Sequence, residues 1–576
     1  MNSAAEISNA QTTDSANESR QRSANWPVSL LVFGSLLTYS AVQTPVPGAN
    51  EPHYLCKARH YWDADYCPGG DFFLDSSNTH LVFYQTIGIF TRWLTLEQTA
   101  WIGRILAYGL LAIGWTLFLR QVLPGEWSPL WAIWIFLAIT RLGDVPRLMN
   151  WSEATGIKSL DRYVLTLSGE WLVGGLEAKV FSYAFVFWAM SEWMQGRQNR
   201  AAIFAGLAVS FHPIVGIWAL IAGGIAELVF RWPSISAAWK QRQVFAAMKT
   251  HWLAGLLLVG FSFPGVIPAL NVVGGADSEV VRQANEIQVF SRLAHHLDPY
   301  RFREGIWLIY GIMLIVWLIL RRFLPTSRNE HWLFLFVLGT LLIALGGWIV
   351  GRVPRLENGL PDSDSFLFSL RMSLMKFYPF RLCDVFAPIA LSVALAGCFA
   401  RISANRMGVN AIRWAGLACV YLFALWSPSL DRDPSRMNEQ TFADWKDACR
   451  WISEKTPANS LVYTANSSPW AFKWYAERAE YFSYKDCPQD PEGILEWRRR
   501  DQILQDWVES YAEIPTYTKA SLRELHEKTG ITHLICEADI VFDIAPVYVS
   551  PQTEKGENQP KTGFAVYELK SAYENP

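Results

Sequence analysis

Residue types that could do chemistry cluster where apolar runs of the sequence end. Glu51 lies in the stretch NEPHY, residues 50–54, only a few positions after the first apolar run. A carboxylate at that depth can be partly desolvated, and it can then act as a general base. Asp71 and Asp75 on the same loop compete with Glu51 for a catalytic or metal-binding role. The alternative for all three is an ordinary solvated loop carboxylate.

Three basic residues, Arg371, Lys376 and Arg381, occur in the stretch LRMSLMKFYPFRLCDVF, which leads into a late apolar run. Arginine makes bidentate contacts and lysine acts as a point charge, so a basic group at this depth suits a phosphate. The alternative for Arg381 is a buried ion pair with Asp384, one helical turn further on.

Polar residues also border or interrupt other apolar runs. Glu177 and Lys179 begin the run LEAKVFSYAFVFWAM, where they either line a cavity that opens outward or reach to the interface. His212 precedes a proline within a long apolar stretch, which makes it a functional-site hypothesis, with a core histidine as the alternative. His295 and His296 point about 100° apart on a helix and are poor metal ligands as a pair. We interpret them as interface residues and His296 as a further site-lining candidate.

The chain has eight cysteines but no CxxC pair, and its histidines lack metal-site spacing, so neither a redox motif nor a zinc site is predicted. Cys56 and Cys67 are eleven positions apart on a loop that we place in an oxidising compartment. They either form a disulfide or remain two unpaired thiols packed against aromatic residues.

Composition indicates which elements position these residues. The chain has 576 residues, 51% of them apolar, a net charge of −2 and a mean hydropathy of +0.12. It is too apolar for an ordinary soluble protein and too charged to lie wholly in a bilayer. The charge gives no basic footprint for nucleic acid, so that partner is excluded. Apolar runs near the bilayer-crossing length of about 20 residues predict eleven passes, at residues 27–44, 99–119, 127–141, 171–193, 201–211, 214–230, 252–272, 305–320, 332–350, 380–400 and 411–428.

Basic residues predict the orientation, because short cytoplasmic loops carry an excess of Lys and Arg. If residues 201–230 form two passes rather than one, the basic short loops all fall on one side, and longer loops with balanced charge fall on the other. We therefore predict a protein of the cytoplasmic (inner) membrane with its N-terminus in the cytoplasm. Its parts are a disordered cytoplasmic tail (1–26), a transmembrane domain (27–430) with an extracytoplasmic loop (45–98), and an extracytoplasmic domain (431–576).

The last part of the chain has a water-soluble pattern. Helical spacing from Phe442 to Ile452 is followed by the strand pattern SLVYTA and a second helix in PWAFKWYAERA. A helix over 519–528 closes at Gly530, and the strand patterns ITHLICEA and FAVYEL follow. Alternating helices and strands predict a small soluble α/β layer domain. The overall fold class is thus an α-helical polytopic membrane protein with a C-terminal α/β domain.

These features together resemble the GT-C-fold superfamily of membrane glycosyltransferases that use polyprenyl-phosphate-linked sugars. The superfamily includes protein mannosyltransferases and the aminoarabinose transferases of lipid A. The resemblance consists of an acidic motif after the first pass, a long first outer loop, a His before Pro in a broken segment, basic residues before a late pass and a C-terminal outer domain. More narrowly, the stretches EPHYL, KARHYW, GLEAKVFSYA, FHPIVGIW, KFYPFRLCDVF and FKWYAERAEYFSYKDCPQD resemble a family of multi-pass proteins of planctomycete-type bacteria.

The superfamily resemblance implies roles for particular residues. Glu51 would match the second member of an acidic pair that serves as base or metal ligand, which makes a divalent metal a candidate cofactor. The first member of that pair is often Asp, but it is Asn50 here. This departure puts both the metal dependence and the strength of the base in question. His212 would meet the donor phosphate, and Arg371 or Arg381 would match the basic residue near the last passes.

We therefore expect transfer of a sugar from a polyprenyl phosphate to a glycan, lipid or protein acceptor at the outer face of the cytoplasmic membrane. Glu51 would be the base, and His212, Arg371, Lys376 and Arg381 would bind the phosphate. The alternative is a non-catalytic transporter or envelope-assembly protein. Transporters often have paired broken helices in corresponding halves, and the sequence offers only one break.

Overall fold

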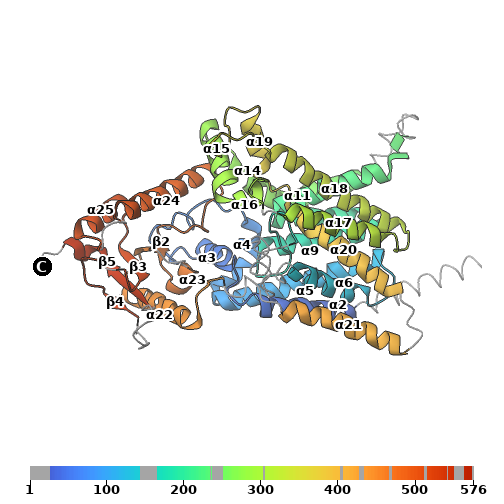
Figure 1. Ribbon diagram of the computed structural model, residues 1–576, viewed down its shortest axis with the longest axis horizontal. Helices are drawn as coiled ribbons and strands as arrows, with labels where there is room; N and C mark the ends of the chain where they lie inside the picture. Colours follow the sequence, from blue (N-terminus) through green and yellow to red (C-terminus); the bar gives the residue numbers. More distant parts are fainter. Residues whose placement is uncertain are drawn as a thin grey trace, which may run out of the picture.

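The computed structural model describes residues 26–573 except 143–164, 234, 237–250, 303–304, 402–406, 427–433, 466–469, 512–515, 541 and 551–562. The predicted cytoplasmic tail therefore lies outside the described residues, apart from Trp26. The molecule is elongated, with long apolar helices at one end and the C-terminal strands at the other (Figure 1).

A helix occupies each of the eleven segments predicted from apolar runs. They are α2 (Trp26–Gln43), α5 (Leu96–Val122), α6 (Ser128–Arg141), α9 (Ala178–Met194), α10 (Gln198–Phe211), α11 (Pro213–Phe230), α14 (Trp252–Val273), α17 (Ile306–Arg321), α18 (Arg328–Gly351), α20 (Arg381–Arg401) and α21 (Met407–Trp426).

Seven of the described helices are long and apolar enough to cross a membrane, which makes the chain a multi-pass membrane protein. Two more, α6 and α17, are apolar but shorter than 18 residues. The exact number of eleven passes stays a prediction. Helices α14, α17 and α21 carry many exposed large apolar side chains, as lipid-facing helices do.

Side-chain contacts fix which helix ends lie together. Gln43 at the end of α2 donates to the carbonyl of Leu425, near the end of α21, at 2.7 Å. Asn329 at the start of α18 donates to the carbonyl of Gln121, near the end of α5, at 3.0 Å. The ends of α2 and α21 therefore share one end of the bundle, and the end of α5 and the start of α18 share the other.

The His212-Pro213 step separates α10 from α11, so residues 201–230 form two helices. His212 has an extended backbone (φ −150°, ψ 94°). It is the C-cap residue of α10 and the N-cap residue of α11. Gly216 permits close packing after the break, because a Cβ there would overlap the backbone of Val209. The interpretation of this stretch as two helices is therefore confirmed. That both helices cross the membrane stays a prediction.

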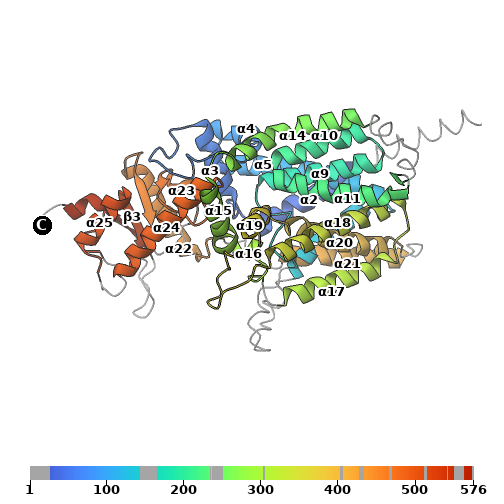
Figure 2. The same cartoon turned by 90° about the horizontal axis from the view of Figure 1, so that it is seen from above.

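Short helices cover the end of the bundle that faces the C-terminal strands (Figures 1 and 2). They are α3 (Glu51–Trp62), α4 (Leu81–Thr86), η1 (Gly88–Arg92), α15 (Ser278–Glu286), the π-helix η4 (Ile287–Arg292), α16 (Ala294–Leu297) and α19 (Phe368–Met375).

The C-terminal part contains a five-stranded sheet in the order β2-β1-β3-β5-β4. Strand β1 pairs in parallel with β2 and β3, and β5 pairs antiparallel with β3 and β4. The strands are β1 (Leu461–Thr464), β2 (Ala479–Glu480), β3 (His533–Glu537), β4 (Tyr548–Val549) and β5 (Phe564–Glu568).

Helices cover both faces of this sheet, because successive strand residues point to opposite sides. One apolar core joins the sheet to α22 (Glu439–Lys455) and α23 (Phe472–Ala476). The other joins it to α24 (Pro491–Tyr511), α25 (Lys519–Thr529) and η5 (Leu569–Tyr573). The predicted strands and the helix that closes at Gly530 are present, and that these residues form a separate soluble domain stays a prediction.

The first long loop contacts this C-terminal part directly. Tyr66 donates to the carbonyl of Lys473 at 2.6 Å, and Ser77 donates to the Asp490 carboxylate at 2.8 Å. Residues 45–98 and the C-terminal part therefore lie at the same end of the helix bundle.

Candidate functional site

Four charged side chains meet at this end of the bundle, and we call Glu170, Glu177, Lys179 and Arg381 the ion network. The Lys179 Nζ lies 2.9 Å from Glu170 Oε1 and 3.1 Å from Glu177 Oε2. The Arg381 Nε lies 2.9 Å from Glu170 Oε2. No member is more than 13% exposed. Two cations offset two carboxylates, so the network is neutral when all four groups are ionised.

His212 extends the ion network into the break between α10 and α11. Its Nδ1 lies 3.4 Å from the backbone nitrogen of Val215, and its other ring nitrogen, Nε2, faces Arg381. The Arg381 Nη1 lies 3.2 Å from this Nε2. A guanidinium can only donate, so Arg381 donates to the His212 ring at this distance, and an anion bound here would take the place of that ring as the acceptor.

His80, the N-cap residue of α4, lies beside His212 with its ring centroid 5.4 Å away. Its Nε2 is 3.5 Å from the Tyr54 hydroxyl, and its Nδ1 is buried without a hydrogen-bond partner. Burial lowers the pKa of His80 to about 3, with His53 and Arg381 adding to the shift. The ring is therefore neutral, and its unpartnered nitrogen is available to a ligand.

The other predicted phosphate-binding residues lie differently. Arg371 donates to the carbonyls of Val350 and Arg352, both at 2.7 Å, so it caps the end of α18. Lys376 is half-buried and has no carboxylate partner within the described ranges. Burial lowers its pKa. The structure thus brings His212 and Arg381 into contact. Lys376 precedes Arg381 by five residues in the sequence.

The loop that carries Glu170 is held by Asp384 and His296. Asp384 accepts from the backbone N–H groups of Leu167 and Ser168, at 2.6 and 2.8 Å, and from the Ser168 hydroxyl at 2.7 Å. The Nδ1 of His296 contacts the Ser168 carbonyl. Asp384 therefore orders this loop instead of pairing with Arg381, so that alternative was wrong. His296 supports the site from outside the ion network.

Glu51 is fully buried and completely paired. Its carboxylate accepts from Arg104 at 2.7 and 2.9 Å, and from the backbone N–H groups of Leu176 at 2.7 Å and Gly48 at 2.6 Å. Four donors occupy its lone pairs, so accepting a further proton would require Arg104 to move. The neighbouring Asn50 side chain contacts Glu177 of the ion network. Glu51 as the base stays a prediction, and the contacts give it an anchoring role for α3.

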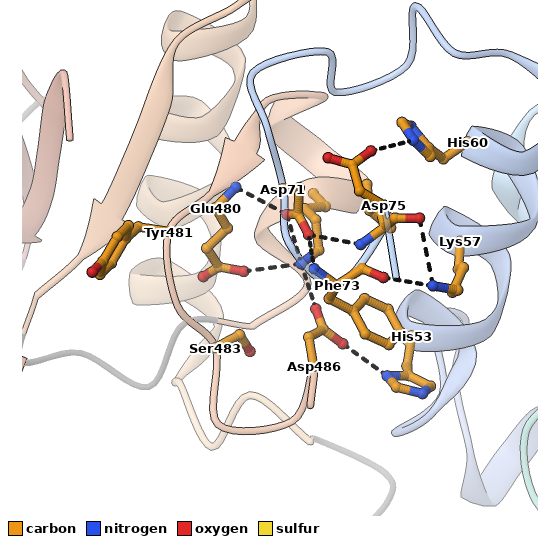
Figure 3. Close-up of polar contacts among 12 residues, drawn as sticks. His53, Lys57, His60, Asp71, Phe73, Asp75, Glu480, Tyr481, Ser483 and Asp486 are labelled. Atoms are coloured by element: carbon orange, nitrogen blue, oxygen red, sulfur yellow. Dashed lines mark hydrogen bonds and ion pairs between the residues drawn. The ribbon is translucent and has the colours of Figure 1, made fainter. Parts of the chain in front are cut away.

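A small cavity of about 40 Å³ lies on the other side of α3, against the C-terminal part, and we call it the interface cavity. Residues 49, 52, 53 and 56 of the first loop line it, at the spacing of one helix face. Its other wall comes from the C-terminal part: Trp470, Ala471, Phe472, Lys473, Glu480, Ser483, Lys485 and Asp486. Figure 3 shows the polar groups of this region.

Lys473 is the central cation of the interface cavity. Its Nζ lies 2.6 Å from Asp486, 3.0 Å from Asp71 and 3.6 Å from Glu480. Asp486 also contacts the His53 Nδ1 at 2.8 Å (Figure 3). Three acids thus surround one lysine, and the excess of carboxylates distinguishes this cluster from the ion network.

Electrostatics gives the three ionisable groups different protonation states. Burial favours the protonated form of Asp486, but Lys473 outweighs burial and holds the pKa of that carboxyl well below its ordinary range. Burial raises the pKa of Glu480 to about 8, and Lys473 only partly opposes this. Burial also lowers the pKa of His53, against the opposing effect of Asp486. At neutral pH Asp486 is ionised, while Glu480 and His53 are neutral.

The remaining predicted residues of the first loop are structural in their contacts. Asp71 accepts from the backbone N–H groups of Phe73 and Leu74 at 3.1 and 3.0 Å, so it shapes the loop. Cys56 and Cys67 are both buried and free, so the disulfide alternative is not the arrangement found. Within the described residues no group of three or more His, Cys, Asp or Glu side chains could hold a metal ion.

Sequence reasoning missed the acids and histidines that complete both clusters. Glu170, His80, His53 and Asp486 were not assigned, although the stretches EPHYL and FSYKDCPQD containing the last two had been singled out. Local spacing could not pair them, because His53 and Asp486 are 433 positions apart. The position of His53, two residues after the predicted base Glu51, was the one available indication.

The fold and the two clusters define a multi-pass membrane protein with buried charge at one end of its helix bundle. Residues 443–503, which include Lys473, Glu480 and Asp486, match a family described as a domain of unknown function (DUF6798). No curated protein matches the chain.

Two solved structures are similar to the chain. The crystal structure of ArnT from Cupriavidus metallidurans in the apo state is 11% identical, with a TM-score of 0.46, over 96% of this chain and 100% of that one. The cryo-EM structure of the arabinofuranosyltransferase AftD from Mycobacteria is 14% identical, with a TM-score of 0.44, over 94% of this chain and 41% of that one. The chain thus spans less than half of AftD. Both TM-scores are below 0.5, so no conclusion about fold or activity rests on these similarities.

Proposed function

We propose that the chain is a glycosyltransferase that moves a sugar from a polyprenyl-phosphate donor to an acceptor at the outer face of the cytoplasmic membrane. The observation that carries the proposal is the convergence of Arg381, Lys179 and His212 at one end of the apolar helices. Arg381 begins α20, Lys179 lies in α9 and His212 joins α10 to α11, so the three residues converge from separate parts of the bundle.

An anionic phosphate would replace a neutral acceptor of Arg381 with a charged one. The Arg381 Nη1 and His212 Nε2 are 3.2 Å apart. A phosphate oxygen would accept a charge-assisted hydrogen bond from the Arg381 guanidinium, and His212 with its proton on Nε2 would donate to the same phosphate. The phosphate would take over part of the role of Glu170 as the partner of Arg381.

The same cations would stabilise the transition state. When the bond from the anomeric carbon to the phosphate oxygen breaks, negative charge develops on the departing polyprenyl phosphate. Positioned donors in a site that excludes water stabilise such charge strongly. Helix α11 begins at this point and exposes Ile217 and Ile221, which give the polyprenyl chain an apolar surface to lie against.

The orientation is part of the proposal. The helix ends opposite the ion network carry basic residues, and an excess of Lys and Arg favours the cytoplasmic side. These residues are Arg120, Arg197, Arg231, Arg321, Arg328 and Arg401. The ion network, residues 45–98 and residues 431–576 would then lie outside.

Arg381→Met tests the proposal, with Arg321→Met as a matched control. Arg321 also pairs with a glutamate at a helix end, 2.7 Å from Glu330, but at the opposite end of the bundle. Protein in nanodiscs would receive radiolabelled undecaprenyl-phosphate pentoses and hexoses, with an extract of bacterial envelope glycans and lipids as acceptor. We expect Arg381→Met to lose about 10²–10³-fold in transfer rate and Arg321→Met to keep its rate. No transfer by the wild type, or equal rates in both variants, would overturn the proposal.

A further inference from the structure

The interface cavity contains an imidazole held by a carboxylate. The Asp486 Oδ1 lies 2.8 Å from the His53 Nδ1, and the His53 ring stacks on Phe73 at 4.4 Å between centroids (Figure 3). Among the described residues the Nε2 of His53 has no hydrogen-bond partner. A carboxylate on Nδ1–H fixes the tautomer in which Nε2 is the basic nitrogen, and it stabilises the imidazolium that forms when Nε2 takes a proton.

A second histidine on the same helix shows that this arrangement is specific. His60 also contacts an aspartate, with its Nε2 3.0 Å from Asp75. Its Nδ1 contacts the carbonyl of Tyr66 at 2.8 Å, so both ring nitrogens have partners. Asp75 is 55% exposed, whereas Asp486 is 11% exposed. Of these two pairs on α3, the His53 pair combines a buried carboxylate with an open ring nitrogen at a cavity, and the His60 pair does not.

Asp486 is itself held in place. Its second oxygen lies 2.6 Å from Lys473, a residue that is 5% exposed and is also bound by Asp71. The lysine keeps the carboxylate ionised and oriented toward His53. The loop FSYKDCPQD, residues 482–490, therefore has a purpose in this arrangement: it delivers Asp486 to α3.

Aromatic and imidazole rings connect the cavity to the ion network. Tyr54 follows His53 in sequence and lies 5.1 Å, between ring centroids, from His80. His80 in turn lies 5.4 Å from His212, the partner of Arg381. The buried His80 Nδ1 between these groups has no partner. An unsatisfied polar atom at this point is the position where a bound sugar would supply a hydroxyl.

We propose that His53 is the general base that activates the acceptor hydroxyl, that Asp486 is its positioning residue, and that the interface cavity binds the hydroxyl-bearing end of the acceptor. The inference rests on the proposed glycosyl transfer. It places the acceptor on the C-terminal side of α3 and the donor phosphate on the helix-bundle side.

The step balances in atoms and charge. The acceptor O–H gives its proton to His53 Nε2, and the oxygen electron pair forms the bond to the anomeric carbon. The bond from that carbon to the phosphate oxygen breaks, and its electron pair leaves with the polyprenyl phosphate beside Arg381 and Lys179. The imidazolium then releases its proton to water, and the products are the glycosylated acceptor, polyprenyl phosphate and one proton.

His53→Gln tests the base, and His60→Gln is the matched control on the same helix. In nanodiscs we expect His53→Gln to bind undecaprenyl phosphate like the wild type but to lose about 10²–10⁴-fold in transfer rate. His60→Gln should keep both properties. Unchanged binding shows that the variant is folded. If His53→Gln transfers at the wild-type rate while Arg381→Met does not, the proposed function stands and the inference falls. If the wild type transfers nothing, both fall.

Asp486→Asn adds a readout that a purely structural role would not change. The base must be neutral, so the wild-type rate should fall as the pH drops through the pKa of His53, which lies below 6.5. Asp486 raises that pKa, so in Asp486→Asn the fall should begin at lower pH, with a lower plateau. The pH dependence of His53 carbethoxylation by diethyl pyrocarbonate, followed by mass spectrometry, should shift in the same direction. A midpoint that does not move would overturn the pairing.

Discussion

The ion network and the interface cavity are two buried charge clusters on opposite sides of α3, and they differ in charge balance. In the ion network Lys179 and Arg381 offset Glu170 and Glu177. In the interface cavity three carboxyl groups surround Lys473. The first cluster presents donors to an anion, whereas the second keeps one carboxyl protonated and another ionised against a histidine. A transferase needs both properties, because it must stabilise a leaving phosphate and deprotonate an acceptor.

Helix α3 holds the two clusters at a fixed separation. Its first residue, Glu51, is bound by Arg104 of α5, and both side chains are fully buried. Asn50 contacts the ion network, whereas His53 faces the cavity. The residue that sequence analysis favoured as the base therefore anchors the helix that carries the proposed base.

The largest effect on stability is expected at this anchor. Arg104→Met leaves Glu51 buried and without its cationic partner, which should cost about 3–5 kcal/mol of unfolding free energy. The double variant Glu51→Gln with Arg104→Met should recover part of the loss, because no unpaired charge remains. Thermal unfolding in detergent measures both. A single variant as stable as the wild type would contradict the anchoring role.

The next largest effect on stability is expected from Lys473→Met, which removes the central cation of the interface cavity. Without the lysine, Asp71 and Asp486 are ionised close together, and the expected loss is about 2–3 kcal/mol near neutral pH. Lys473 is what holds the pKa of Asp486 down against burial, so that pKa would rise on folding in the variant, and stability should fall more steeply than in the wild type as pH increases. Lys528→Met serves as the control, because Lys528 lies in an exposed pair with Glu524 and surface pairs contribute little. Equal unfolding temperatures of the two variants would show that Lys473 is not central.

Much of the helix bundle was predictable, because apolar runs of bilayer length leave few alternatives. The eleven segments coincide with helices, and the His212-Pro213 step does separate two of them. The pairing of charges was not predictable. Arg381 has Asp384 one turn away, yet it pairs with Glu170, 211 positions earlier, because the loop before α9 folds over the start of α20. Such long-range contacts depend on how helices pack, and local spacing holds no information about them.

A smaller effect is expected from Glu480→Gln. The pKa of Glu480 rises from an ordinary 4.5 to about 8 on folding, so the unfolded chain binds fewer protons between these values. Wild-type stability should therefore fall as pH rises through about 8, as the buried carboxyl ionises beside Asp71 and Asp486. Glutamine cannot ionise, so the variant should show a flatter profile than the wild type over this pH range. Parallel unfolding curves from pH 5 to 9 would contradict the assigned protonation state.

The smallest effect should come from Lys376, which sharpens the description of the ion network. Lys376→Met removes a half-buried cation five residues before Arg381 without breaking an ion pair with a described residue. We expect binding of undecaprenyl phosphate in nanodiscs to weaken about threefold, equivalent to about 0.7 kcal/mol, with unfolding temperature unchanged. Arg371→Met should instead lower stability, because Arg371 caps α18. Weaker binding in Arg371→Met together with lower stability in Lys376→Met would contradict these two roles.

A cryo-EM structure of the protein in nanodiscs with undecaprenyl phosphate tests the central claim most directly. The account predicts phosphate density between Arg381 Nη1 and His212 Nε2, within hydrogen-bond distance of both, with the Glu170 carboxylate moved away from the guanidinium. Phosphate density elsewhere on the bundle, with the contact between Arg381 and Glu170 intact, would contradict it.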